Sequence, residues 1–268
     1  MVVGPQPIKA LGQHWLHDET VLSEMAESAY DARASLICEI GPGLGTLTRY
    51  LLMKGLPVTA IEFDGELAKK LKKRVNSSHI ELLNVIEGDI RTFDFTSFNE
   101  NYVISANIPY YLTSHLIRIL TETKNKPLKV ALLIQKEVAE RIAASPGKMG
   151  LLSCITQYFY DTNLGSVVPA HLFTPPPKVD SQILILTRKL PKFEADWPRL
   201  LRLLKAGFSE KRKNLKNALS GGLAISKQDA EILLHNARID VNRRAESLSM
   251  SEWQNLYDAF SLLDSLRK

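Results

Sequence analysis

The stretch Asn107-Ile108-Pro109-Tyr110-Tyr111 carries residue types that could activate an aromatic amine. The exocyclic amine of adenine is a poor nucleophile, because its lone pair is delocalised into the ring. The side-chain oxygen of Asn107 and the carbonyl of Ile108 could accept its two N–H hydrogens and favour a pyramidal nitrogen. Pro109 would aim these acceptors in advance, and Tyr110 could stack on an extruded base. Asn-x-Pro is also common in ordinary turns, so the surrounding elements must decide.

The elements that would position this loop alternate between strands and helices. Apolar runs predict strands at residues 36–40, 57–63, 80–86, 102–106, 130–134, 154–160 and 181–187. Helical spacing is predicted over residues 46–54, 65–75, 112–123 and 135–143. This alternation predicts an α/β fold with a mainly parallel, Rossmann-like sheet covered on both faces. Its ligands should lie at the carboxyl ends of the strands.

Beyond Pro191 the pattern becomes wholly helical. Helices are predicted at residues 197–208, 211–219, 227–236 and 251–266. We therefore expect a catalytic domain over residues 1–190 and a small helical domain over residues 191–268.

Polar and glycine residues follow the first three predicted strands in an ordered way. The turn Gly41-Pro42-Gly43-Leu44-Gly45 would bring the backbone close to a ligand, and Glu62, at the end of the second strand, could accept hydrogen bonds from ribose hydroxyls. After the third strand, Asp89 could accept from an adenine amine while Ile90 packs on the ring. An NAD-dependent oxidoreductase would share the sheet and Glu62, but it offers no reason for the loop at Asn107. A comparison of S-adenosylmethionine binding with NAD binding would separate the two interpretations.

Composition narrows the class of protein further. The chain has 268 residues, 45% of them hydrophobic, with no apolar stretch of the ~18 residues that a membrane span requires. A cytoplasmic protein that binds no membrane is expected. Cys38 and Cys154 lie in apolar runs that read as strands, which predicts buried, inert thiols. No cluster of residues with metal-ligand spacing is present in the sequence, so no metal is expected.

Positive charge is concentrated in one segment. Residues 188–217 contain ten Lys or Arg and three Asp or Glu, a net charge of +7 against +5 for the whole chain. Beside a base-modifying site, such a segment favours contacts with RNA phosphates. The predicted RNA-binding residues are Lys205, Lys211, Arg212, Lys213 and Lys216. The alternative interpretation is a solvated helix face whose charges aid only solubility.

Six ordered motifs resemble a known family, the KsgA (RsmA) small-subunit rRNA adenine dimethyltransferases. They are residues 9–18 (KALGQHWLHD), 39–45 (EIGPGLG), 87–89 (EGD), 107–110 (NIPY), 135–141 (QKEVAER) and 173–181 (FTPPPKVDS). The resemblance extends from about residue 6 to about residue 260. It implies a class I methyltransferase sheet, the cofactor S-adenosylmethionine, and dimethylation at N6 of two adjacent adenosines in the 3′-terminal hairpin loop of 16S rRNA. The implied partner is this RNA within the small ribosomal subunit or its precursor, bound by a monomer.

The resemblance also implies roles for particular residues. The cofactor would contact Gln13, His14, Leu16, Gly41, Glu62, Phe63, Asp89, Ile90 and Asn107. Phe173 would be a second aromatic around the flipped base, beside the catalytic stretch from Asn107 to Tyr110.

Three departures and two alternatives accompany this interpretation. The segment after residues 145–147 looks shorter than is usual in the family. Trp15 stands where the family generally has Phe, and Glu210 introduces a negative charge into the basic segment. Erm-type 23S rRNA methylases share the catalytic loop, although Phe208 to Leu219 favours the 16S family. A mainly non-catalytic ribosome assembly factor could also use this scaffold. An intact Asn107 and Asp89 argue against loss of catalysis.

Overall fold

The computed structural model describes residues 12–98, 101–191 and 193–266. The chain divides into two compact units, Met1–Glu140 with Asp161–Arg188, and Arg141–Tyr160 with Lys189–Lys268. We expected a single domain boundary near residue 190. The chain also enters the second unit earlier, because residues 141–160 belong to that unit. Within this earlier segment, helix α6 (Leu151–Phe159) buries Cys154, Ile155 and Tyr158 in the apolar cluster of the second unit.

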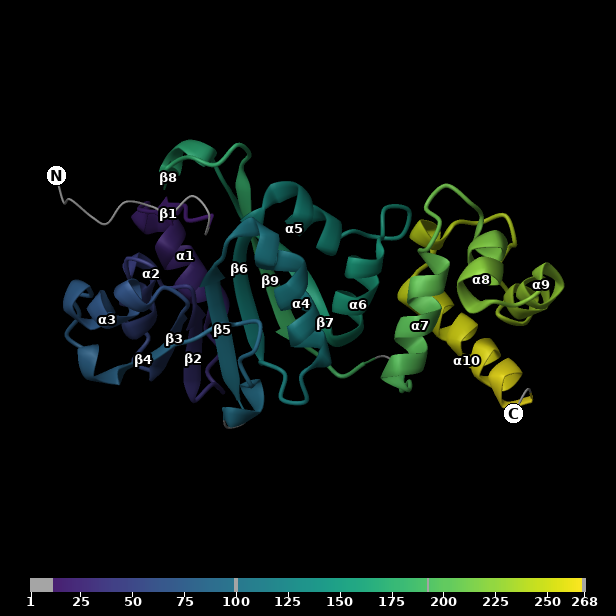
Figure 1. Ribbon diagram of the computed structural model, residues 1–268, viewed down its shortest axis with the longest axis horizontal. Helices are drawn as coiled ribbons and strands as arrows, with labels where there is room; N and C mark the ends of the chain where they lie inside the picture. Colours follow the sequence, from purple (N-terminus) through teal and green to yellow (C-terminus); the bar gives the residue numbers. More distant parts are fainter. Residues whose placement is uncertain (1–11, 99–100, 192, 267–268) are drawn as a thin grey trace. The chain divides into compact units, whose positions relative to one another are not determined.

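The first unit is built on a seven-stranded sheet (Figure 1). In spatial order its strands are β4 (Leu83–Glu87), β3 (Val58–Glu62), β2 (Leu36–Ile40), β5 (Tyr102–Asn107), β6 (Lys129–Gln135), β9 (Ser181–Arg188) and β7 (Tyr160–Val168). Strands β4, β3, β2, β5 and β6 pair in parallel, and β9 pairs antiparallel with β6. The predicted α/β sheet is confirmed. Because β2 lies between β3 and β5, the chain order reverses there, which is where such sheets bind ligands.

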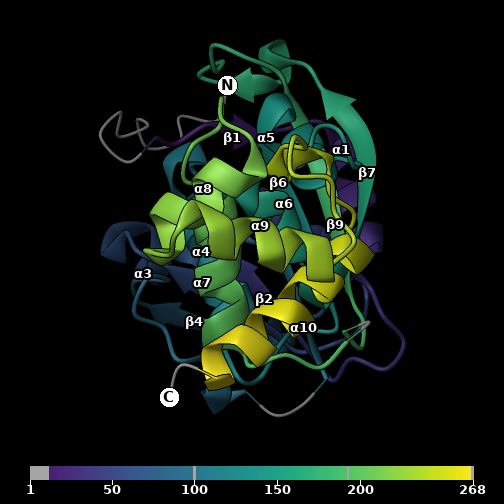
Figure 2. The same ribbon diagram turned by 90° about the vertical axis from the view of Figure 1, so that its right-hand side faces the viewer.

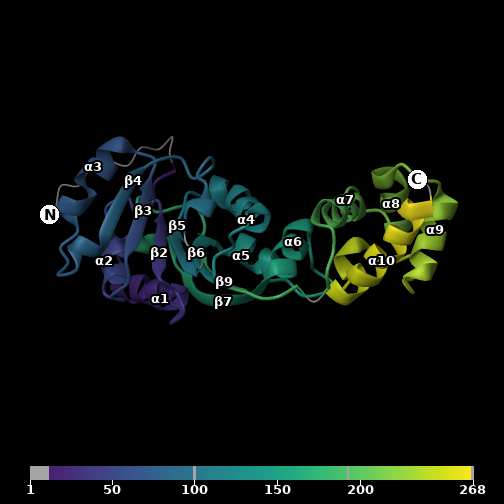
Figure 3. The same ribbon diagram turned by 90° about the horizontal axis from the view of Figure 1, so that it is seen from below.

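Helices connect and cover the strands. They are α1 (Glu19–Ala29), α2 (Thr46–Leu52), α3 (Gly65–Arg74), α4 (Thr113–Glu122) and α5 (Lys136–Ile142). Figure 3 shows α1 and α4 on opposite faces of the sheet. Helix α1 was not predicted from the sequence, although Asp18 begins it by accepting a hydrogen bond from the Val21 amide at 2.9 Å. Its buried Leu22 and Met25 have helical spacing, a signal that could have identified it.

Two predicted elements were wrong. The apolar run 154–160 is helical up to Phe159, and the strand β7 begins only at Tyr160. Cys154 is therefore a buried helical residue rather than a strand residue. The helix predicted over residues 211–219 begins only at Leu215, because Asn214 caps it by accepting a hydrogen bond from the Asn217 amide at 3.1 Å. The three basic residues 211–213 thus lie in the preceding turn.

The second unit also contains helices α7 (Trp197–Gly207), α8 (Leu215–Leu223), α9 (Lys227–Asn236) and α10 (Met250–Leu266) (Figure 2). Trp253 of α10 is fully buried among them. A Cβ atom at Gly207 would lie 2.5 Å from the Trp253 ring, so glycine is required for α7 to accept this indole. The unit has an apolar core of its own.

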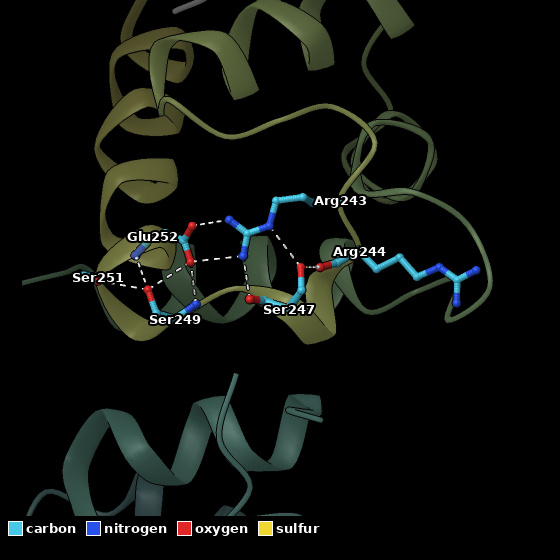
Figure 4. Close-up of polar contacts among 6 residues, drawn as sticks. All are labelled: Arg243, Arg244, Ser247, Ser249, Ser251 and Glu252. Atoms are coloured by element: carbon cyan, nitrogen blue, oxygen red, sulfur yellow. Dashed lines mark hydrogen bonds and ion pairs between the residues drawn. The ribbon is translucent and has the colours of Figure 1, made fainter. Parts of the chain in front are cut away.

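Hydrogen bonds around Arg243 fix the loop before α10 (Figure 4). Ser249 and Glu252 form a reciprocal cap, in which the Ser249 amide donates to the Glu252 carboxylate at 2.8 Å and the Glu252 amide donates to Ser249 Oγ at 3.2 Å. The Arg243 guanidinium pairs with the same carboxylate and donates to the Ser247 carbonyl at 2.5 Å. The Arg243 carbonyl accepts from the Leu215 amide at 2.7 Å, which ties this loop to the first turn of α8.

The contact between α7 and α8 yields a test of the second unit. A Cβ atom at Gly222 would lie 2.5 Å from the Ala206 Cα atom, so Gly222→Ala must push the helices apart, and we expect a loss of ~1–3 kcal/mol in the free energy of unfolding. Gly221→Ala is the matched control. Its Cβ would meet only Glu210 Oε1, at 3.6 Å, and it should stabilise α8 by ~0.5–1 kcal/mol. Urea unfolding measures both, and equal effects would contradict this packing.

Candidate active site

A short two-stranded sheet brings the N-terminal motif to the carboxyl ends of the main strands. In it, β1 (Trp15–Leu16) pairs antiparallel with β8 (Phe173–Thr174), with Leu16 opposite Phe173. This places Gln13 to Leu16 in the wall of a pocket shared with the strand ends. Lys9 to Leu11, the start of the same motif, lie outside the described residues.

The glycine turn lines this pocket, and Glu62 holds the turn through a hydrogen bond from the Gly43 amide. Gly41, Gly43 and Gly45 have φ angles of 68°, 56° and 82°, a region that side chains other than glycine rarely adopt. Glu62 Oε2 accepts from the Gly43 amide and Glu62 Oε1 accepts from the Asp64 amide, both at 2.9 Å. Burial raises the pKa of Glu62, against the lowering effect of these amides. The carboxylate is thus fixed at the strand end before any ligand arrives.

Asp89 follows β4 in an ion pair that the sequence analysis did not predict. Arg91 donates to Asp89 through its backbone amide and its Nε at 2.9 Å, and through its Nη2 at 2.6 Å. These hydrogen bonds lower the pKa of Asp89, and Asp89 in turn raises the pKa of Arg91, with a smaller contribution from Tyr111. Asp89 therefore carries its charge at neutral pH. Its neighbour Ile90 is buried and also lines the pocket.

The Asn107 amide has a defined orientation at the end of β5. Asn107 Nδ2 donates to the main-chain carbonyl of His14 at 3.3 Å. A carbonyl oxygen can only accept, so this contact directs the nitrogen of the amide toward His14 and leaves Oδ1 as an acceptor. Asn107, the last residue of β5, lines the pocket together with Ile108 and Pro109.

Aromatic side chains complete the pocket wall. The Tyr110 ring stacks on the His14 ring, with centroids 6.0 Å apart, and its hydroxyl lies 2.8 Å from Ser181 Oγ. His14 Nδ1 lies 2.7 Å from the Pro175 carbonyl oxygen. Phe173 lines the pocket but is only 3% exposed, so the free protein presents little of this ring.

One pocket thus brings together all the residues predicted for the cofactor and for the chemistry. These are Gln13, His14, Leu16, Gly41, Glu62, Phe63, Asp89, Ile90, Asn107, Ile108, Pro109, Tyr110 and Phe173. Further residues of its wall were not given a role from the sequence, among them Glu39, Arg91 and Tyr111. Glu39 begins the predicted motif 39–45, and Arg91 follows the motif 87–89 by two residues, but no residue pattern in the sequence assigns either of them a function.

The predicted RNA-binding residues all lie in the second unit, and their charges are not equally available. Lys213 pairs with Glu210 at 2.5 Å, and Lys216 lies 3.5 Å from Glu231. The exposed Lys205, Lys211 and Arg212 make no ion pair within the part of the chain that the structure describes. Lys205 belongs to α7 and the other two to the turn before α8. The run of positive residues in the sequence therefore overstates the charge that a partner encounters.

Glu39 is a buried acid beneath the glycine turn. Its side chain is 1% exposed, and its Oε2 has no hydrogen-bond partner among the described residues. Burial raises the pKa of Glu39 to about 8, opposed by the nearby Thr48 hydroxyl and reinforced by the charge of Glu62. The carboxyl group is therefore protonated at neutral pH, unlike that of Asp89.

This raised pKa predicts a pH dependence of stability. Between the ordinary pKa of 4.5 and the raised value near 8, the unfolded chain releases a proton that the folded protein retains, so stability falls as pH rises through this window. Glu39→Gln removes this loss, and we expect its stability relative to wild type to improve by on the order of 1 kcal/mol per pH unit. Denaturant unfolding from pH 5 to 8 measures it. A difference that is constant across this range would show that Glu39 is charged in the folded protein.

Among the described residues, no helix is long and apolar enough to cross a membrane. Nor do the described side chains include a cluster of three or more His, Cys, Asp or Glu that could hold a metal ion.

The chain is similar to known rRNA methyltransferases along nearly its whole length. A ribosomal RNA small subunit methyltransferase A from Dehalococcoides mccartyi is 38% identical over 258 residues, which cover 92% of this chain and 86% of the relative. The crystal structure of a dimethyladenosine transferase from Plasmodium falciparum superposes with a TM-score of 0.78 at 26% identity, covering 93% and 98% of the two chains. The 23S rRNA methyltransferase ErmE gives a TM-score of 0.75 at 25% identity, covering 92% and 99%.

The model of one protein family matches residues 7–261, a span that includes the glycine turn, Asp89, the Asn107 loop and the basic segment. With this match and the relative at 38% identity, the chain belongs to the ribosomal RNA adenine dimethylase family.

Proposed function

We propose that this protein uses S-adenosylmethionine to dimethylate N6 of two adjacent adenosines in the 3′-terminal hairpin loop of 16S rRNA. The substrate would be the small ribosomal subunit or its precursor, and the enzyme would act as a monomer. The observation that carries the proposal is the Asn107 amide, whose oxygen is left as an acceptor beside Glu62 and Asp89 in one pocket. The 38% identical relative is named for action on the small subunit, whereas ErmE is named for 23S rRNA and is less similar, at 25% identity.

The donor set of the pocket fits this cofactor. Each Glu62 oxygen already accepts one backbone N–H and retains a lone pair for a ribose hydroxyl. Asp89 can accept from the adenine amine, while Ile90 and Phe63 offer apolar surface to the ring. A Cβ atom at Gly41 would meet only the Asn107 carbonyl oxygen, 4.0 Å away, so the turn leaves open space at this point. Gln13, His14 and Leu16 would close the opposite side.

The residues of the Asn107 loop would carry the chemistry. S-adenosylmethionine supplies an electrophilic methyl group when bound. Asn107 Oδ1 and the Ile108 carbonyl would accept the two N–H hydrogens of the target amine, which localises its lone pair toward the methyl group. Pro109 holds both acceptors, and Tyr110, fixed by Ser181 and His14, would stack on the base. Since the hydrogen bond to His14 already orients the Asn107 acceptor, its interaction energy would fall largely on the transition state.

The second unit would supply RNA affinity. Lys205, Lys211 and Arg212 offer exposed, unneutralised charge for phosphates, and Lys213 and Lys216 would contribute less because Glu210 and Glu231 offset them. Phe173, nearly buried here, would act as the second aromatic around the base.

Asn107→Ala tests the chemistry. Removal of one oriented acceptor should lower the single-turnover rate of methylation ~10²–10³-fold, with small subunits lacking the modification as substrate. Binding of the subunit should be nearly unchanged. Wild-type turnover by the variant would overturn the assignment of Asn107, and methylation of 23S rather than 16S rRNA by the wild-type protein would overturn the proposed substrate.

The double variant Lys211→Glu, Arg212→Glu tests the RNA-binding surface. We expect weaker binding to small subunits and a slope of log affinity against log salt that is flatter by roughly 0.7–0.9 for each phosphate that the variant no longer binds. Cofactor affinity should not change, because the cofactor pocket belongs to the first unit. Lys72→Glu, Lys73→Glu, on the exposed face of α3, makes the same change in total charge and is the control. Equal effects of the two double variants would mean that only net charge matters.

A further inference from the structure

Two residues at the pocket have no part in the function proposed above. Arg91 and Tyr111 both line the pocket, yet the Arg91 side chain is 52% exposed and Tyr111 is 63% exposed. A ligand enclosed by a pocket normally loses most of its surface to the walls, so side chains this open lie at the rim. Both side chains are therefore accessible to a ligand at the pocket entrance.

Asp89 orients the Arg91 guanidinium and occupies only one of its hydrogen-bonding edges. Its Nε and Nη2 form one edge, which holds the Asp89 carboxylate. No hydrogen bond from its Nη1 is present among the residues described in the structure. The fork geometry of arginine gives a second edge, formed by Nη1 and Nη2, that can bind a phosphate while the first edge holds a carboxylate. Asp89 therefore fixes the direction in which this free edge points.

The Tyr111 ring lies next to Gly12 and is largely exposed. A Cβ atom built on Gly12 would lie 3.5 Å from Tyr111 Cε1 and 3.7 Å from its Cδ1, so Gly12 lies beside one edge of the ring. In contrast to Tyr110, whose hydroxyl lies 2.8 Å from Ser181 Oγ, Tyr111 makes no hydrogen bond through its hydroxyl within the described part of the chain. An exposed aromatic ring is a stacking platform for a nucleic-acid base.

The occupant of this rim follows from its chemistry and its place. An aromatic face and a free guanidinium edge match one base and one phosphate of a single strand. Tyr111 directly follows Tyr110, which the proposed function places on the target adenine. We propose that Tyr111 stacks on a nucleotide that flanks the target adenosine, and that Arg91 binds a phosphate of the same strand through the edge that Asp89 leaves free. This inference rests on the proposed function, since it takes the substrate to be RNA.

The arrangement gives Asp89 a second role. The same carboxylate would accept from the cofactor amine and orient the arginine that holds the RNA. Asp89→Asn should therefore weaken both cofactor binding and RNA binding, whereas Arg91→Lys should weaken RNA binding chiefly. Lysine keeps the positive charge but has no two-edged fork.

The test compares Tyr111→Ala, Tyr111→Phe, Arg91→Gln and Arg91→Lys with wild type. For each protein, subunit affinity is measured directly at several salt concentrations, cofactor affinity by calorimetry, and the single-turnover rate at saturating subunit. Lys124→Gln is the charge control for Arg91→Gln. Lys124 is exposed and precedes β6, at the amino end of that strand and far from the pocket rim.

Tyr111→Ala should raise the dissociation constant for subunits roughly 5- to 150-fold, corresponding to ~1–3 kcal/mol for one stacked base. Tyr111→Phe should bind as wild type. Arg91→Gln should flatten the salt slope by roughly 0.7–0.9, the value for one phosphate. Arg91→Lys should bind subunits more weakly than wild type. For the Tyr111 and Arg91 variants, subunit affinity should fall by a larger factor than either the cofactor affinity or the rate at saturating subunit.

Three results would overturn this inference. Wild-type subunit affinity in Tyr111→Ala and Arg91→Gln would show that neither residue binds the RNA. If the variants lost mainly cofactor affinity rather than subunit affinity, both residues would belong to the cofactor site. If Lys124→Gln lowered subunit affinity as much as Arg91→Gln does, Arg91 would contribute only through the net charge of the protein. If the wild-type protein bound subunits without methylating them, the proposed activity would be wrong. The subunit affinities of the Tyr111 and Arg91 variants would still test whether these two residues bind RNA.

Discussion

The hydrogen bond from the Asn107 amide to the His14 carbonyl is the constraint on which the site depends. It requires the N-terminal motif to lie across the carboxyl ends of the strands, which the pairing of Leu16 with Phe173 ensures. It also requires β5 to end at Asn107, next to the point where the order of the sheet reverses. A side-chain amide that rotated freely would present nitrogen as readily as oxygen to an incoming amine. The fold removes that ambiguity before a substrate binds.

The two units divide the physical tasks. The first provides fixed acceptors at the ends of buried parallel strands, where backbone amides already hold Glu62. The second builds its own core around Trp253 and fixes its loops through Arg243 and the cap of α10. Its exposed Lys211 and Arg212 lie in a turn, where side chains can adapt to a phosphate backbone more easily than on a packed helix. The residues proposed for the chemistry and those proposed for RNA contacts thus lie on separate cores.

Much of the site could be predicted from the sequence, because parallel strands bring their carboxyl ends to one edge. Gly41, Glu62, Asp89 and Asn107 follow four successive strands, so their convergence depends on topology alone. Contacts set by side-chain direction, such as the ion pair of Asp89 with the arginine two residues later, were not predictable. The run that ends at Phe159 was interpreted as a strand because short apolar runs do not distinguish a strand from a buried helix.

The surroundings of three acidic side chains in the pocket affect their pKa values differently. Glu39 is neutral because burial raises its pKa, Asp89 is charged because Arg91 stabilises it, and Glu62 is held by two backbone amides while burial works against its charge. A charged Glu39 would repel the neighbouring Glu62, which already raises the pKa of Glu39. With one acid protonated and another paired, the pocket retains negative character for a positively charged cofactor without that repulsion. Acceptors for recognition and a stable arrangement of the acids are therefore compatible within one strand-end pocket.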